Sequence, residues 1–293
     1  MNLVIVSPFP PYRGGISKET EILYQGFIKD CHQVKIINFK KLYPNFFFPG
    51  KSQYDENYVN NPNIDTTREL STLNPISWRK TSRTIINIKF DAVIFRFWHP
   101  ILIPAYSNII NTIKRNKPNA RIYCIADNAI PHENFFIFDK YFIKRFFNKF
   151  TGIFTMSSNV KNQIEQFVDR SLIKNVFLPI KEKSVSILSK SNSMEKIGIS
   201  EKFVILYFGL IRKYKGLDIL IKAIKEMKPV NNDFKLLIAG ESYDSRQKYL
   251  KIINKLNISD RIIWIDKYIN ESDVDLYFSA SDVVVLPYKS ASQ

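Results

Sequence analysis

The sequence has few of the residues that build disulfide scaffolds or metal centres. It contains two cysteines, Cys31 and Cys124, far apart in the chain, and three histidines without metal-ligand spacing. This content excludes a disulfide framework and a cysteine-based zinc site, and it is typical of a reducing compartment. The G-x-G-x-x-G pattern of dinucleotide binding is also missing, which argues against an NAD enzyme.

Long hydrophobic runs are absent as well. Crossing a bilayer takes ~18 consecutive apolar residues, and the nearest segment, 90–110, contains Asp91, Arg96 and His99. The first six residues lack a basic region and a cleavage site, so they predict a buried strand and not a signal peptide. We therefore expect a cytoplasmic protein, either soluble or peripheral on the inner face of the cell membrane.

Acidic residues are outnumbered by basic ones, 27 to 43, which gives a net charge of +16. This excess has two interpretations, a partner that carries phosphate groups or a solvated lysine-rich surface, and composition does not separate them. No basic block interleaved with aromatic residues matches a nucleic-acid module, so a nucleic-acid partner is not expected.

Short apolar runs alternate with helical patterns, which predicts parallel sheets covered by helices on both faces. The segment 181–202 is rich in serine and lysine and predicts a linker. We thus expect an α/β protein with an N-terminal domain over 1–180 and a C-terminal domain over 203–293. The latter has only four predicted strands, so we expect it to be incomplete. The predicted strands are 3–6, 34–39, 92–97, 122–126, 153–155, 176–178, 203–208, 234–239, 261–265 and 282–286.

Two segments stand outside this alternation. Residues 40–74 are polar and rich in asparagine and proline, and they predict a long loop. Residues 135–150 place Lys140, Lys144, Arg145 and Lys149 on one side of a helix and phenylalanines on another. That composition is typical of an interfacial membrane helix, and it is equally compatible with aromatics in the core and cations in solvent.

Paired glycines follow the first predicted strand. Gly14 and Gly15 precede a helix that begins near Ser17, so their backbone N–H groups and the positive helix end would bind a phosphate or a carboxylate. A tight turn between strand and helix would require glycine in any case.

A second glycine loop follows the strand 203–208. Gly209 is followed by Arg212, Lys215 and Gly216, and then by an amphipathic helix. This pattern resembles the F-G-x-[IL]-x-x-x-K-G-x-x-x-L-[IL]-x-A segment of the family 4 glycosyltransferases, retaining enzymes of the GT-B fold, and other segments resemble a bacterial branch of that family. The resemblance implies two Rossmann-like domains facing a cleft. It also implies that Arg212 and Lys215 bind the donor diphosphate, and that Gly14, Gly15, Gly209 and Glu241 belong to the donor site.

The segment from Asp127 to Glu133 resembles the His-Asn-x-x-Pro-His-Glu segment of that family, with Asp127 in place of the first histidine. The resemblance suggests Asp127 and His132 as catalytic residues, with Asp127 accepting a hydrogen bond from a sugar hydroxyl. An alternative role for His132 is to order the loop. The Glu-rich loop of the family, expected after Pro287, is not found in the last residues.

The resemblance implies a glycosyltransferase that moves a sugar from a UDP- or GDP-sugar to a glycan or a lipid-linked acceptor, in cell-surface polysaccharide synthesis. It implies no cofactor and no metal, because protein cations neutralise the diphosphate. An anionic membrane surface is a possible further partner. The alternative is an inactive fragment that acts only as a binding module. A nucleotide-sugar epimerase is less favoured, because its acidic and histidine clusters are reduced here to Asp127, His132 and Glu133.

Overall fold

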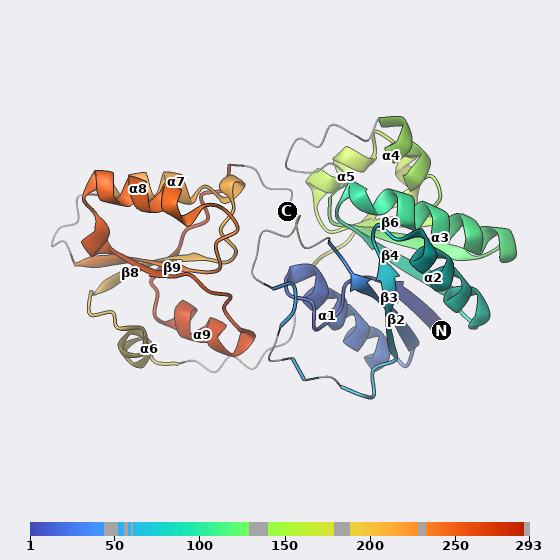
Figure 1. Cartoon of the computed structure of the whole chain (residues 1–293), viewed down its shortest axis with the longest axis horizontal. Helices are drawn as coiled ribbons and strands as arrows, with labels where there is room; N and C mark the ends of the chain where they lie inside the picture. The colour runs from blue at the N-terminus through green and yellow to red at the C-terminus, as the bar shows by residue number, and fades with distance from the viewer. Residues whose placement is uncertain are drawn as a thin grey trace. The chain divides into compact units, whose positions relative to one another are not determined.

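The computed structural model describes residues 1–43, 52–55, 58, 59, 61–128, 140–178, 188–227 and 233–289. The chain divides into two compact units, and the division falls between Lys181 and Glu182 (Figure 1). Both units are built from parallel strands joined by helices.

The first unit contains a seven-stranded parallel sheet in the order β3-β2-β1-β4-β5-β6-β7. The order runs outward from the centre in both directions, so β1 and β4 are the neighbours between which it reverses. Ligands of open parallel sheets bind outside the carboxyl ends of the strands at such a point. The strands are β1 (Asn2–Val6), β2 (Gln33–Lys41), β3 (Thr66–Ser71), β4 (Ala92–Phe97), β5 (Arg121–Ala126), β6 (Gly152–Thr155) and β7 (Ile173–Asn175).

Helices cover both faces of this sheet. Helix α1 packs on one face, where Tyr24 joins Phe9 and the residues Ile5 and Ile36 of the sheet. The other helices pack on the opposite face, as Figure 1 shows. They are α2 (Pro75–Asn87), α3 (Ile103–Asn116), α4 (Lys140–Phe147) and α5 (Ser158–Ile164), and α1 spans Gly15–Lys29.

Two details of this unit correct the sequence-based expectations. The predicted loop 40–74 contains strand β3, an edge strand whose only buried hydrophobic residue is Leu70, so its sequence carries no apolar alternation. The strand expected at 176–178 lies instead at Ile173–Asn175. Ile173 fills the core, whereas Phe177 is 99% exposed.

The second unit contains a parallel sheet of four described strands, the number that the sequence predicts, and their order is β10-β9-β8-β11. Helices α7 and α8 pack on one face, and α6 and α9 on the other (Figure 1). The strands are β8 (Phe203–Phe208), β9 (Phe234–Ala239), β10 (Ile262–Ile265) and β11 (Val283–Val284); the helices are α6 (Lys190–Ile197), α7 (Leu217–Glu226), α8 (Arg246–Leu256) and α9 (Glu271–Ser279).

Helix α6 lies inside the segment that the sequence assigns to a linker. The Ser189 side chain caps it by accepting a hydrogen bond from the Asn192 N–H, and Gly198 ends it in a left-handed conformation. Met194 and Ile197 pack against the same core cluster as α9. Residues 190–197 are therefore part of the second unit, and the predicted linker is corrected to that extent.

Helix α4 divides its aromatic residues between core and surface. Ile143, Phe146 and Phe147 are buried, whereas Tyr141 and Phe142 are exposed. Phe138, which the sequence places on the apolar side of this helix, lies outside the described residues. In the part of the chain that the structure describes, no helix combines the length and the apolar character needed to cross a bilayer.

Candidate functional site

The backbone that follows β8 and the backbone that follows β9 are in close contact at Gly209 and Gly240. Gly209 follows β8 with a φ of 107°, and Gly240 follows β9 with a φ of 153°. A Cβ on Gly240 would lie 2.0 Å from the Gly209 carbonyl oxygen. Only glycine fits at this crossing. The Ile211 N–H donates to the Glu241 carbonyl oxygen at 2.9 Å, so the loops after the two strands are joined.

The loop after β8 turns through a short 3₁₀ helix, Lys213–Lys215, into α7. Gly216 has a φ of 71°, and a Cβ there would lie 1.9 Å from the Pro287 carbonyl oxygen. The segment 285–289 passes over the loop. The Lys289 N–H donates to the Tyr214 carbonyl oxygen at 2.7 Å, and its ammonium group lies 2.8 Å from Asp218 Oδ2. The shape of this loop therefore depends on residues more than seventy positions away, a contact that the local pattern does not reveal.

The Arg212 and Lys215 side chains bring two cations to this loop. Lys215 Nζ lies beside Gly209, 3.4 Å from where a Cβ would stand, and 5.4 Å from the centre of the Tyr288 ring. The Arg212 guanidinium lies over Tyr243 at 5.1 Å. Neither cation forms an ion pair with any residue that the structure describes. Burial, together with the charge of Arg212, lowers the pKa of Lys215 to about 8.

The predicted donor-binding residues of the second unit thus gather at one edge of its sheet. Glu241 is buried at the start of the loop after β9, and its backbone is bonded to the loop that carries Arg212. The pair of cations without a carboxylate partner in the described ranges gives this edge a local positive charge. Two cations placed in this way can form charge-assisted hydrogen bonds with an anion that carries two charged groups.

In the first unit, Gly14 and Gly15 form the start of α1. Gly14 has a φ of 108°, and a Cβ added to it would have nothing within 4 Å, so its backbone is strained for other residues but is not crowded. The preceding loop is fastened by Asn38, which donates to the Phe9 carbonyl oxygen at 2.9 Å and accepts from the Phe9 N–H at 3.1 Å.

A second fastening comes from residues 52–55, a segment to which the sequence assigns no role. The Arg13 N–H donates to the Gln53 carbonyl oxygen at 2.9 Å, and the Asp55 N–H donates to the Pro11 carbonyl oxygen at 2.7 Å. The Tyr12 and Tyr54 hydroxyl groups lie 3.2 Å apart. The loop that precedes Gly14 is therefore held both by Asn38 and by the segment 52–55.

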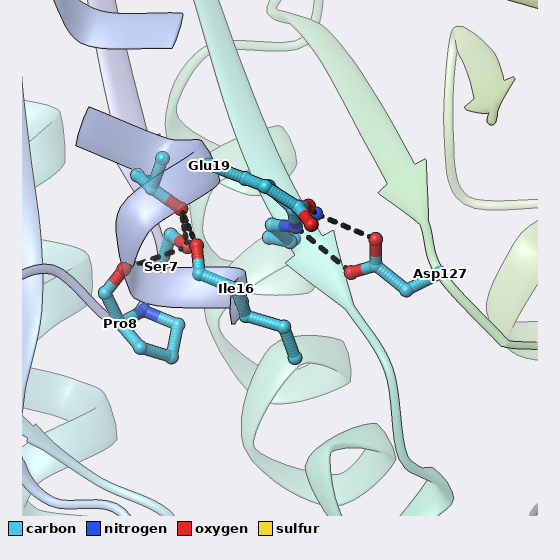
Figure 2. Close-up of polar contacts among 7 residues, drawn as sticks. Ser7, Pro8, Ile16, Glu19 and Asp127 are labelled. Atoms are coloured by element: carbon cyan, nitrogen blue, oxygen red, sulfur yellow. Dashed lines mark hydrogen bonds and ion pairs between the residues drawn. The ribbon is translucent and has the colours of Figure 1, made fainter. Parts of the chain in front are cut away.

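A buried charge cluster of Glu19, Arg96 and Asp127 lies near this loop. Arg96 on β4 is 2% exposed, and it donates from Nε to Asp127 Oδ2 at 2.8 Å and from Nη2 to Asp127 Oδ1 at 2.6 Å. Nη2 also binds Glu19 Oε2. Figure 2 shows Glu19 and Asp127 pointing toward each other from α1 and from the end of β5. Two carboxylates share one guanidinium, so the cluster is one unit negative when all three groups are ionised.

A pair of hydroxyl groups, on Ser7 and Thr20, joins the start of α1 to the end of β1 (Figure 2). Ser7, at the end of β1, places its Oγ 2.7 Å from Thr20 Oγ1, and Thr20 donates to the Ile16 carbonyl oxygen at 2.7 Å. Ser7 and Thr20 are both fully buried. Their contact holds the helix to the strand at the position next to Glu19.

This geometry changes the expectation that Asp127 accepts a hydrogen bond from a sugar hydroxyl. Asp127 is 4% exposed, and both of its oxygens bind Arg96. Arg96 and Glu19 were missed by sequence reasoning, although an arginine inside the apolar run 92–97 was a signal of a buried charge. His132 lies outside the described residues. Among the described residues, no three His, Cys, Asp or Glu side chains are grouped as metal ligands.

Comparison with known proteins gives matches of two kinds. Residues 189–292 match the family model of the glycosyl transferases group 1, which covers the second unit with α6 and the loop of Arg212 and Lys215. A search of curated proteins found no match to this chain.

Solved structures resemble the chain over both units. A glycosyltransferase from Rickettsia africae is 17% identical, with a TM-score of 0.70, and the match covers 98% of this chain and 73% of that one. HepE of Anabaena in complex with UDP-glucose is 14% identical, with a TM-score of 0.67, covering 97% and 73%. The catalytic domain of starch synthase IV from Arabidopsis thaliana, bound to ADP and acarbose, is 13% identical, with a TM-score of 0.65, covering 98% and 78%. The chain therefore has the α/β fold of the GT-B glycosyltransferases, built from Rossmann-like units with parallel sheets.

Proposed function

We propose that this protein is a glycosyltransferase that transfers a sugar from a nucleotide diphosphate sugar to a glycan or lipid-linked acceptor. The observation that carries the proposal is the pair of cations Arg212 and Lys215, which lack carboxylate partners among the described residues and lie at the carboxyl end of β8. The match of residues 189–292 to the glycosyl transferases group 1 model supports it.

The roles proposed for the donor-binding residues follow from the negative charge that develops on the leaving diphosphate. When the sugar leaves, negative charge grows on the β-phosphate oxygen, and fixed cations next to that oxygen lower the barrier. Arg212 and Lys215 supply those cations, and Gly209 leaves room for the diphosphate beside Lys215. Glu241 lies at the same edge and is assigned to the donor. We assign Gly14 and Gly15 to the donor phosphate as well, through their backbone N–H groups.

The acceptor side is assigned to the first unit. His132 and Asp127 are the residues that the sequence favours there. Because both Asp127 oxygens bind Arg96, we propose that Asp127 acts through this guanidinium and not at the reacting atoms. Retention of configuration and independence from metal ions belong to the same proposal, and both follow from the resemblance to family 4.

The donor and the acceptor are proposed by class. The UDP-glucose bound to HepE and the ADP bound to starch synthase IV favour a nucleotide sugar with a diphosphate, and UDP or GDP is the proposed nucleotide. Tyr141 and Phe142 are exposed on α4 next to the exposed cations Lys144 and Arg145. This surface supports the proposal that the protein contacts an anionic membrane. A cytoplasmic location and a lipid-linked acceptor used for surface polysaccharide belong to the same proposal.

The test is a donor screen with UDP-glucose, UDP-N-acetylglucosamine, GDP-mannose and ADP-glucose, in which release of the nucleoside diphosphate is measured. For the productive donor, Arg212→Ala and Lys215→Ala should each lower kcat/KM about 10- to 100-fold, since each removes a hydrogen bond between charged groups. The matched control is Lys213→Ala, because Lys213 is exposed in the same loop.

Two outcomes would contradict the proposal. One is wild-type activity in folded Arg212→Ala and Lys215→Ala variants. The other is nucleotide binding without any turnover, which would favour the alternative of a non-catalytic binding module.

A further inference from the structure

The Glu19–Arg96–Asp127 cluster contains two carboxylates for one guanidinium, which is one carboxylate more than an ion pair requires. Arg96 and Asp127 already form a two-bond pair in which both side chains are almost completely buried. Glu19 adds a second negative charge to the same Nη2. Burial is the largest influence on the pKa of Glu19 and raises it; the charge of Arg96 opposes this increase, the charge of Asp127 adds to it, and the pKa stays above its ordinary value. A carboxylate in this position is unfavourable for folding at neutral pH, which calls for a functional reason.

The two oxygens of Glu19 are placed differently. Oε2 binds Arg96, while Oε1 receives no hydrogen bond from any residue in the described ranges. Glu19 keeps 18% of its side chain exposed, in contrast to its two partners. Oε1 also lies 3.6 Å from the position of a Cβ on Gly15, so it is next to the glycine loop.

The topology places this oxygen where a ligand of the sheet would bind. Arg96 is near the carboxyl end of β4, Asp127 directly follows β5, and Glu19 lies in the second turn of the helix that follows β1. These elements surround the point between β1 and β4 where the strand order reverses. A carboxylate oxygen accepts hydrogen bonds and donates none, so the group it recognises has to be a donor.

On the basis of the proposed function, we infer that Glu19 Oε1 accepts a hydrogen bond from a hydroxyl group of the acceptor sugar. Arg96 and Asp127 are then positioning residues that hold the carboxylate through Oε2. The ion pair with Arg96 fixes Glu19 Oε2 and thereby orients Glu19 Oε1. The excess negative charge makes the second oxygen a stronger acceptor, because a hydrogen bond to an ionised group is about twice as strong as one between neutral groups.

The test replaces Glu19 with Gln, which keeps the size of the side chain and an oxygen for Arg96. We expect Glu19→Gln to raise the acceptor KM about 10-fold with octyl glucoside, octyl galactoside or octyl N-acetylglucosaminide as acceptor probe. The affinity for the nucleoside diphosphate should not fall, because the two cations assigned to it lie in the second unit and because the variant removes a negative charge next to Gly15. The melting temperature should stay the same or rise, because the variant removes an unfavourable buried charge. Glu21→Gln, the same change two residues further along α1, is the matched control.

A readout without turnover uses binding alone. The carboxyl carbon of Glu19 is followed by ¹³C NMR while the same octyl glycosides are added, and its resonance should shift in the wild type and in Glu21→Gln. Calorimetric titration with the same glycosides compares the variants: loss of binding in Glu19→Gln but not in Glu21→Gln, with an unchanged melting temperature, would support the inference even if transfer were too slow to measure.

Other results would overturn it. An unchanged acceptor KM in Glu19→Gln would do so while leaving the proposed function intact. A lower melting temperature together with weaker nucleotide binding would show that Glu19 is only structural. A rise in acceptor KM in Asp127→Asn but not in Glu19→Gln would transfer the contact to Asp127. Absence of both nucleotide and glycoside binding in the wild type would overturn the proposed function and this inference with it.

Discussion

The two units place charge at the carboxyl ends of their parallel strands in opposite ways. At the end of β8, Arg212 and Lys215 are two cations without carboxylate partners among the described residues. At the ends of β4 and β5, Arg96 is saturated by two carboxylates. Both places adjoin a glycine: Gly209, with a positive φ, lies beside Lys215, and Gly15 lies next to Glu19 Oε1. The same type of sheet thus supports one edge suited to an anion and another suited to hydroxyl donors.

The strongest test of this contrast removes one cation from each edge. Arg96→Met leaves Glu19 and Asp127 buried without a counter-ion, and breaking a buried pair in this way costs about 3–5 kcal/mol. Lys215→Met removes a cation whose pKa is already lowered by burial, so stability should be unchanged or higher while nucleotide binding becomes about 10- to 100-fold weaker. Urea unfolding followed by circular dichroism measures the stability of both variants, and titration with UDP measures the binding. Equal destabilisation by the two substitutions would contradict the contrast.

Backbone geometry predicts the next largest effect. Gly216→Ala would combine a left-handed residue with a Cβ placed 1.9 Å from the Pro287 carbonyl oxygen. We expect a loss of about 3 kcal/mol in the free energy of unfolding, together with weaker nucleotide binding. Gly198→Ala is the control for φ alone, because Gly198 has a φ of 79° and open space around it. It should cost about 1 kcal/mol and leave nucleotide binding unchanged. Similar values for the two variants would show that Pro287 does not constrain the loop.

The two edges also differ in how far the sequence predicts them. The sequence predicts the edge in the second unit, because Gly209, Arg212, Lys215 and Gly216 are neighbours in the chain and form a local pattern. For the edge in the first unit, the sequence predicts only Asp127 and the paired glycines. Arg96 lies 31 residues from Asp127 and 77 from Glu19, and only the sheet order brings the three together.

The missed elements have a similar cause. Strand β3 is a polar edge strand, and α6 is a short helix with a single buried side chain, Ser193. Neither has the apolar periodicity on which sequence reasoning relies, because their buried side chains are Glu69, Leu70 and Ser193, of which only Leu70 is apolar. The strands β8 and β9, buried on both faces, were predicted with their observed bounds.

The smallest expected effect concerns the proton on Lys215. With a pKa of about 8, this lysine is largely neutral above that pH, whereas a bound diphosphate favours the ammonium form. Nucleotide binding should therefore raise the pKa of Lys215 and take up roughly three quarters of a proton at pH 8.5. The affinity should fall as the pH rises through about 8. Calorimetry with UDP in two buffers of different ionisation enthalpy measures the uptake. Lys215→Arg keeps the cation but removes the titration, so its binding should proceed without uptake and with little dependence on pH in this range. Equal uptake in the wild type and in Lys215→Arg would show that another group binds the proton, and it would remove Lys215 from contact with the diphosphate.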